Sequence, residues 1–149
     1  MENFEAFLPA KFRNLQDGVL ITNAAGQILW FNLEFESMCG HKLEEVIGKK
    51  PGSFLQGLKS APEAIQSMRA AINAERPCSV ELINYHKDGH EYLVHIAFRP
   101  VRDVDGSIGY FAAIERECTQ EELDRIGRET LESQLQASLA ELVKELQRE

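Results

Sequence analysis

The 149-residue chain lacks the features that define several large classes of protein. Its three cysteines are an odd number at wide spacings, so they indicate neither a disulfide framework nor a zinc-type pairing, and reduced thiols in the cytoplasm are the default. No apolar run approaches the roughly 18 residues that span a bilayer, and the first residues lack the basic start of a signal peptide. A net charge of −8 disfavours contact with nucleic acid. We therefore expect a cytoplasmic protein with neither a membrane nor nucleic acid as its partner.

Signatures of catalysis are missing as well. The chain shows no Ser/His/Asp arrangement with a supporting motif, no glycine-rich phosphate-binding loop, and no kinase or cyclase signature. Its histidines suggest no metal cluster, because His41, His86 and His90 fall in expected loops or on the surface. We predict that the chain is not an enzyme and has no metal site.

Hydrophobic periodicity runs through most of the chain and predicts an α+β fold. Two strands at residues 18–23 and 28–32 form a hairpin, and three more follow at 78–85, 91–101 and 108–118. Asp-Gly pairs mark the two turns between the last three strands. Helices are expected between the two groups of strands, at 33–39, 43–48 and 62–74. This order predicts helices packed on one face of an antiparallel sheet.

The N-terminal segment has an amphipathic pattern of its own. It places apolar residues at helical spacing, namely Phe4, Phe7, Leu8, Phe12 and Leu15. We predict a short helix, broken at Pro9, and two roles are open for it. It either covers an edge of the core or contacts a second copy of the chain.

The C-terminal segment changes character from Thr119 onward. Glycine, proline and aromatic residues nearly vanish, and leucines recur at intervals of four, three and four, at Leu135, Leu139, Leu142 and Leu146. This is the spacing of a coiled-coil seam, and an isolated helix gains little stability in water. We predict a homodimer through this seam, or a signalling helix that leads to an output domain not identified by the sequence.

Two motifs carry a family resemblance. Residues 48–57 read Gly-Lys-Lys-Pro-Gly-Ser-Phe-Leu-Gln-Gly, and residues 84–89 read Asn-Tyr-His-Lys-Asp-Gly. Together with Phe31, Asn32 and Phe35 they resemble the light-oxygen-voltage (LOV) subgroup of PAS sensor domains. The resemblance implies the PAS fold, a five-stranded antiparallel sheet with flanking short helices. It divides the chain into an N-terminal cap helix (1–16), a sensor domain (17–119) and a C-terminal signalling or coiled-coil helix (120–149).

Three residues fall on positions that bind flavin in the LOV subgroup. Gln56 matches the pocket glutamine, whose amide can both donate and accept hydrogen bonds. Arg69 matches the helix arginine that pairs with flavin phosphate, with a solvated surface arginine as the plain alternative. Asn84 matches the asparagine that reads the pyrimidine edge of the ring. Strands disfavour asparagine, so a buried partner explains it better than chance.

Four positions depart from the LOV pattern. Gly52 stands where the photoactive cysteine would be, and Ser53 replaces an arginine that would share the phosphate. Val94 replaces a second asparagine, and Glu115 replaces the glutamine that would face the flavin N5 and O4 edge. Strand alternation places Asn84, Val94 and Glu115 on the pocket face of their strands and His95 on the outer face.

These matches and departures together predict a flavin-binding sensory module without cysteinyl–flavin photochemistry. FAD is favoured over FMN because FAD-binding redox PAS domains depart at the same positions and often carry a proline like Pro51. The expected signal is redox state or oxygen. The alternative is a PAS module for dimerisation or small-ligand binding without flavin. Haem is disfavoured, because residues 62–74 offer no axial histidine.

Glu115 is also the predicted relay to the last helix. It lies just before the exit of the final strand, and burial beside a ligand would raise the pKa of its carboxyl group. A change in its protonation or rotamer could then bias the helix that follows. The alternative is a carboxylate that bends to solvent or pairs with a cation such as Arg69.

Overall fold

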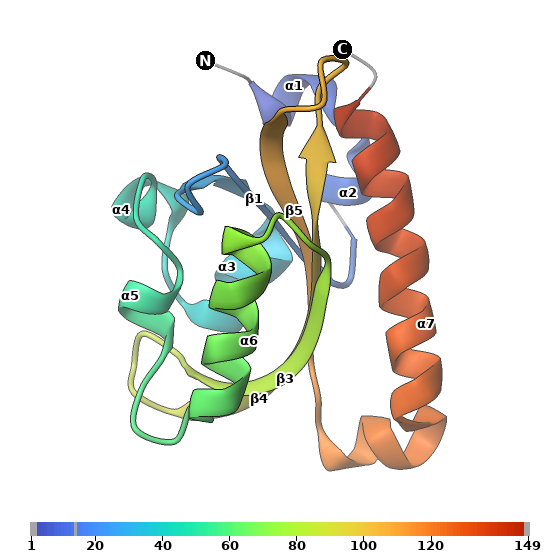
Figure 1. Cartoon of the computed structure of the whole chain (residues 1–149). Helices are drawn as coiled ribbons and strands as arrows, with labels where there is room; N and C mark the ends of the chain where they lie inside the picture. The colour runs from blue at the N-terminus through green and yellow to red at the C-terminus, as the bar shows by residue number, and fades with distance from the viewer. Residues whose placement is uncertain (1–2, 14, 148–149) are drawn as a thin grey trace.

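A single antiparallel sheet organises the chain in the computed structural model, which describes residues 3–13 and 15–147 (Figure 1). Its strands are β1 (Gly18–Thr22), β2 (Ile28–Phe31), β3 (Cys78–Tyr85), β4 (Glu91–Arg102) and β5 (Ile108–Glu117). They lie in the order β2-β1-β5-β4-β3, so the first and last strands of the chain are neighbours in the centre. The predicted five-stranded antiparallel sheet and α+β fold are confirmed.

Helices cover both faces of this sheet, whereas the sequence pattern predicted one. The inner face is covered by α3 (Leu33–Cys39), α4 (Leu43–Val46), α5 (Gly52–Leu55) and α6 (Pro62–Asn73). The outer face is covered by α1 (Phe4–Phe7), α2 (Ala10–Arg13) and α7 (Gln120–Leu146), as Figure 1 shows. The molecule therefore has three layers and two apolar cores, one on each side of the sheet. In the described part of the chain, no helix has the length and apolarity that a bilayer span requires.

Asn32 fixes the point where the inner helices leave the sheet. Its buried side chain accepts hydrogen bonds from the backbone N–H groups of Phe35 (3.0 Å) and Val19 (2.9 Å). It also donates to the carbonyls of Phe12 (3.0 Å) and Asp17 (3.1 Å). An N-cap asparagine normally satisfies one free N–H of a helix. Here the same amide also joins α2 and β1 to the start of α3.

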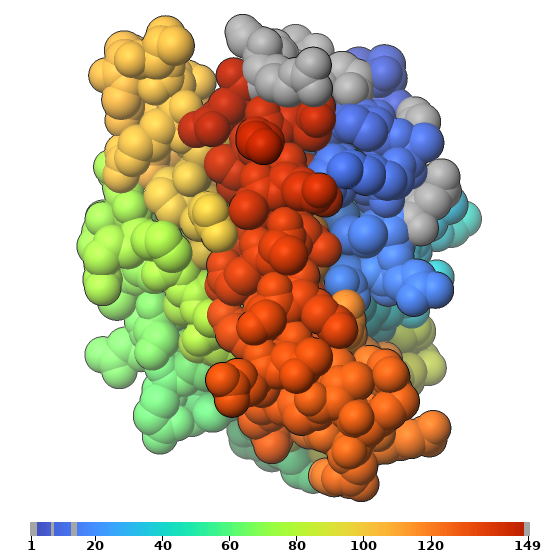
Figure 2. Space-filling model, turned by 90° about the vertical axis from the view of Figure 1, so that its right-hand side faces the viewer, coloured from blue at the N-terminus to red at the C-terminus, as the bar shows by residue number. Residues whose placement is uncertain are grey.

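The C-terminal helix folds back over the outer face of its own sheet. Gly127 has φ +78° and ψ 159°, which breaks the helical geometry near the start of α7 and redirects it. Figure 2 shows the helix in orange and red, with the blue N-terminal segment along one side and green and yellow segments along the other. The seam leucines are buried against sheet residues Val19, Ile21, Ala97, Ala112 and Ile114.

The predicted coiled-coil seam is therefore wrong. Leu135, Leu139 and Leu142 are fully buried within one chain and cannot also contact a second one. The spacing identified an apolar stripe correctly. It could not identify the partner of the stripe, because a helix facing a sheet buries the same positions as a helix facing another helix. The homodimer predicted through this seam loses its basis.

The two N-terminal helices cover the core, which decides between their two predicted roles. Phe4, Leu8 and Phe12 are buried in the outer-face cluster that contains the seam leucines. The Phe4 ring lies 5.5 Å from the Tyr110 ring and 6.4 Å from the Trp30 ring, between centroids. The prediction for the Phe7 side chain falls outside the part of the chain that the structure describes. These helices and α7 together close the outer face.

Candidate functional site

The inner face of the sheet contains a buried amide oxygen without a hydrogen-bond partner among the described residues. Asn84 on β3 is 2% exposed and lies opposite Tyr92 of β4. Among the described residues, no group donates a hydrogen bond to its Oδ1 atom. Buried polar atoms almost always have a partner, and an unmade hydrogen bond costs about 1–3 kcal/mol. The unpaired oxygen therefore marks a place where a donor from outside the chain would fit.

A buried carboxyl group shares this face. Glu115 on β5 is 4% exposed and lies opposite Ile96 of β4. Burial raises the pKa of its carboxyl group to about 8, so the group is protonated at neutral pH. Its charged form would in turn raise the pKa of Tyr92 and of Cys39, both of which burial already raises. The predictions that Glu115 points inward and has a raised pKa are confirmed, and the alternative of an ion pair with Arg69 is wrong.

Val94 completes the trio predicted on the pocket face. It is fully buried in the inner core and lies opposite Leu82 of β3. It offers no hydrogen bond, so Asn84, Glu115 and the hydroxyl of Tyr92 supply the polar groups near it on this face. The strand register predicted from alternation holds for all three.

Gln56 and Gly52 meet at the short helix α5. A Cβ atom added to Gly52 would lie 3.0 Å from both amide atoms of Gln56, so a side chain at position 52 would displace this amide. Ser53 is exposed, and its Oγ donates to the carbonyl of Lys50 at 2.7 Å. The structure thus brings Gln56 and Gly52 together and leaves Ser53 bonded to its own helix start.

The loop after α5 is tied to β3 by residues whose role the sequence did not show. The Tyr85 hydroxyl accepts from the N–H of Lys59 at 3.0 Å, and Ser60 donates its hydroxyl to the carbonyl of Ile83. The Ser60 hydroxyl also accepts from the N–H of Gly57 at 3.0 Å. A Cβ on Gly57 would lie 2.4 Å from the Tyr85 ring. These contacts hold Gln56 beside the strand that carries Asn84. In the sequence, the signal for this contact was that Tyr85 directly follows Asn84 and Gly57 directly follows Gln56.

Arg69 is exposed on α6, away from the buried trio. It lines a surface hollow of about 490 Å³ that is formed by one side of this helix, from Pro62 to Asn73. The structure therefore separates the predicted residues into two groups. Asn84, Val94 and Glu115 lie together inside, while Arg69 and Ser53 lie at the surface.

The thiols of the chain are poor nucleophiles at neutral pH. Burial raises the pKa of Cys39 and of Cys118 to about 11, and it also raises the pKa of Cys78. Since thiolates rather than thiols are reactive, all three are held in the unreactive form. Cys39 lies on α3, Cys118 lies beyond the end of β5, and Cys78 begins β3.

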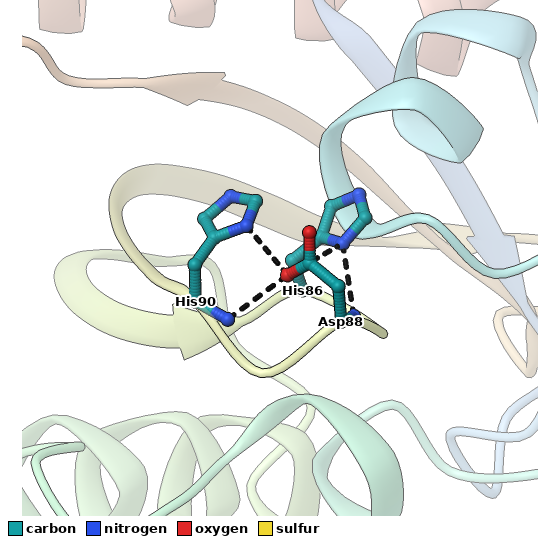
Figure 3. A group of neighbouring side chains, drawn as sticks. All are labelled: His86, Asp88 and His90. Atoms are coloured by element: carbon teal, nitrogen blue, oxygen red, sulfur yellow. Dashed lines mark hydrogen bonds and ion pairs between the residues drawn. The ribbon is translucent and has the colours of Figure 1, made fainter.

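The histidines divide between the outer face and one hairpin loop. His95 faces outward as predicted, with Nε2 2.5 Å from a carboxylate oxygen of Glu132 on α7. His86 and His90 lie in the β3–β4 loop, also as predicted. With Asp88, they place one potential ligand atom each within 4.8 Å of one another, a proximity that the sequence did not predict (Figure 3). The alternation His-Lys-Asp-Gly-His was the missed signal, because a tight loop brings residues i, i+2 and i+4 to one side.

Comparison with known proteins agrees with this architecture. Residues 16–120 match the PAS domain family. A blue-light-activated histidine kinase of Rhizobium johnstonii is 37% identical over 93 residues, which cover 62% of this chain and 27% of that protein. Blue-light-activated histidine kinase 1 of Erythrobacter litoralis is 32% identical over 103 residues, covering 69% of this chain and 28% of that protein. The chain thus spans about a quarter of the length of the curated relatives it matches.

Solved structures show the same fold. The LOV domain of the Erythrobacter litoralis EL346 blue-light activated histidine kinase has a TM-score of 0.66 at 27% identity and covers 71% of this chain and 99% of its own. The light-state structure of the photoreceptor Aureochrome1 LOV has a TM-score of 0.68 at 23% identity, covering 85% and 98%. The sheet order, the inner helices and the match over residues 16–120 lead to one conclusion: the chain belongs to the PAS-domain family and to its LOV-like subgroup.

Proposed function

We propose that this chain is the sensory module of a signalling protein and that its inner face binds a flavin. The observation that carries the proposal is the Oδ1 atom of Asn84, which has no partner among the described residues and is buried on the same face as the carboxyl group of Glu115. A flavin pyrimidine ring has an N–H donor flanked by carbonyl acceptors, which suits an asparagine amide. Relatives named as blue-light-activated kinases support this choice of ligand.

Three residues fit three different parts of such a ligand. Asn84 would bind the pyrimidine edge, Gln56 would contribute a second amide from α5, and Arg69 would take the phosphate at the surface. The apolar residues between them, including Val94, would exclude water from the ring. A bound flavin supplies redox chemistry that no side chain of this protein has.

FAD remains our preferred flavin, with FMN as the second choice. The preference rests on Pro51 and on Ser53, which removes one of the two cations that the LOV subgroup uses for the FMN phosphate. In the structure the Ser53 hydroxyl donates to the carbonyl of Lys50 at the start of α5, so Arg69 is left as the candidate for phosphate binding.

We further propose that the response does not use a cysteine. Gly52 replaces the reactive residue, and the three thiols are kept protonated by burial. Cys78 shares the inner face with Asn84, but it lies six residue steps away along β3, about 20 Å of strand. A change of redox state is the response that needs no thiol, and Glu115 is the group placed to gain or lose a proton with it.

A short chain of contacts leads from Glu115 to the last helix. The next residue, Arg116, forms a bidentate pair with the buried Asp17, at 2.6 and 3.0 Å. It also donates to the amide oxygen of Gln134 on α7 at 2.7 Å. A change in charge or position of Glu115 would therefore reach α7 through one peptide unit. We propose that α7 transmits the signal to an output such as the kinase region of the relatives.

The second candidate function is a PAS module that binds a different small molecule. It is favoured by Val94, which leaves one strand amide where the LOV subgroup has two. The two candidates predict different colours for the purified protein. A flavin-free small-ligand module is colourless and does not take up added flavin.

Identification of the released chromophore tests the proposal. The purified chain is denatured, and the supernatant is separated and analysed by mass spectrometry alongside FAD and FMN standards. We expect a flavin at close to one equivalent, with FAD in excess of FMN, and a loss of that flavin in Asn84→Leu. A colourless protein that also fails to bind added FAD or FMN would contradict the proposal.

A further inference from the structure

The β3–β4 hairpin gathers two imidazoles and a carboxylate outside the candidate pocket. Nδ1 of His90 lies 2.6 Å from Oδ1 of Asp88, and Nδ1 of His86 lies 3.2 Å from the same oxygen. The two rings stack, with centroids 4.5 Å apart and planes 17° from parallel. Figure 3 shows the carboxylate of Asp88 between the two imidazoles on one side of the loop.

We propose that His86, Asp88 and His90 form a binding site for a divalent transition metal such as Zn²⁺. Two imidazoles and one carboxylate are the ligand types that Zn²⁺, Ni²⁺ and Cu²⁺ prefer, and water would fill the remaining positions. Mg²⁺ and Ca²⁺ prefer sites made wholly of oxygen ligands. The site lies apart from the residues proposed to bind flavin, because Asp88 and His90 are exposed in the β3–β4 loop.

The loop backbone holds the three side chains in this arrangement. The N–H of His86 donates to the carbonyl of His90 at 2.8 Å, and the N–H of Gly89 donates to the carbonyl of His86 at 2.9 Å. Gly89 adopts φ +99°, a conformation that a residue with a side chain rarely takes. The turn therefore fixes the spacing of the ligands before any metal arrives.

The electrostatics of the loop also suit a cation. The backbone N–H of His90 donates to the Oδ1 atom of Asp88 at 3.0 Å, which fixes the orientation of this anionic side chain. In the metal-free loop, Nδ1 of His86 accepts a hydrogen bond from the N–H of Asp88 at 3.1 Å, so this nitrogen carries a lone pair. Metal binding would replace that weak contact with a coordinate bond.

The site lies against the end of helix α3. A Cβ added to Gly40 would lie 2.3 Å from the His86 ring, and the N–H of Lys87 donates to the carbonyl of Cys39 at 2.9 Å. The hairpin that carries the site therefore packs against the helix that forms one wall of the inner core.

Calorimetric titration of the untagged full chain with Zn²⁺ and with Mg²⁺ tests the site. We expect one Zn²⁺ per chain and no Mg²⁺ binding, with Zn²⁺ affinity at least about tenfold weaker in Asp88→Asn and in His86→Gln/His90→Gln. Asp105→Asn is the matched control, because Asp105 closes the β4–β5 loop in the same way without histidines. Circular dichroism checks that each variant is folded.

A spectroscopic readout separates this site from weak binding elsewhere. One equivalent of Cu²⁺ added to the wild type should give an electron paramagnetic resonance spectrum with coupling to two nitrogens, reduced to one in His90→Gln. His41→Gln, a histidine outside the triad, should leave the spectrum unchanged. Equal Zn²⁺ affinity in the wild type and the double variant, or a Cu²⁺ spectrum without nitrogen coupling, would overturn the proposal.

Discussion

The buried polar groups on the two faces of the sheet differ in whether the chain itself supplies their partners. On the outer face, both ring nitrogens of His95 lie near carboxylates, Glu132 at 2.5 Å and Glu81 at 3.4 Å. On the inner face, the carbonyl oxygen of Asn84 has no donor among the described residues, and burial keeps the Glu115 carboxyl group protonated. The outer face is thus completed by the chain's own helix. On the inner face, we propose that a ligand supplies the missing donor.

The difference has a consequence for stability. Buried groups with partners stabilise a specific packing, whereas each unpaired group costs about 1–3 kcal/mol in the absence of a ligand. A ligand that binds the folded state alone adds stability by mass action. The outer face should therefore respond to changes in packing, and the inner face should respond to ligand and to pH.

The largest expected effect comes from removing the cover of the outer face. Truncation after Thr119 exposes Val19, Ile21 and Ile114 and removes six buried leucines. At roughly 1.5–3 kcal/mol for each buried side chain, we expect a loss of more than about 5 kcal/mol in the free energy of unfolding. Urea denaturation and light scattering should show an unstable, aggregating fragment. A fragment as stable and monodisperse as the full chain would show that α7 is dispensable for the fold.

The next effect tests the unpaired acid of the inner face in the ligand-free protein. Because the folded-state pKa of Glu115 is raised to about 8, the folded state binds the proton more tightly than the unfolded state, and stability falls as pH rises. Relative to Glu115→Gln, wild-type stability should fall by on the order of 3 kcal/mol between about pH 4.5 and 7.

Denaturation curves across pH check this, and Glu117→Gln is the control because Glu117 lies exposed on the same strand. The control should keep the wild-type slope. If Glu115→Gln keeps that slope as well, the carboxyl group is not buried as an acid, and the contrast between the faces is weaker.

A smaller effect is expected where the outer face is polar. Glu132→Ala removes the carboxylate that contacts both the buried His95 and the exposed Ser79, so the Nε2 atom of His95 loses its shortest contact. We expect a loss of about 1–3 kcal/mol and faster hydrogen exchange in α7. Glu129→Ala, an exposed change on the same helix, should cost little. Equal effects of the two substitutions would argue that the contacts of Glu132 with His95 and Ser79 do not stabilise the outer face.

The smallest expected effect is none. After illumination of the flavin-loaded chain, we predict no slowly reverting adduct, because position 52 is glycine and the thiols are protonated. Gly52→Cys should introduce such an adduct, with a new near-ultraviolet band, once the Gln56 amide moves aside. An adduct in the wild type that disappears in Cys78→Ser would show that our assignment of the pocket thiols is wrong.

The sequence predicted what depends on short-range periodicity. Alternation along the strands placed Asn84, Val94 and Glu115 on one face, because side-chain direction in a strand repeats every two residues. The leucine stripe of α7 was visible because residues three and four apart lie on the same face of a helix. Its partner was not, since the sheet face it covers is formed by residues more than 20 positions away, such as Ile114. The helix α5 has four residues, too few for any periodic signal.

The histidine triad shows a different limit. His86 and His90 were correctly placed in a loop, but their convergence depends on the backbone angles of that loop. Arg69 shows the converse case. Its motif position suggested the pocket, and the structure places it in a surface hollow on α6.

The central claim is that the inner face is completed by a ligand, and Asn84→Leu tests it most directly. The measurement is the unfolding midpoint of wild type and variant, each with and without added FAD. We predict that the variant is at least as stable as the wild type without flavin, because it removes an unpaired buried oxygen, and that it loses the stabilisation that flavin gives the wild type. A variant that is destabilised equally with and without FAD would contradict the account.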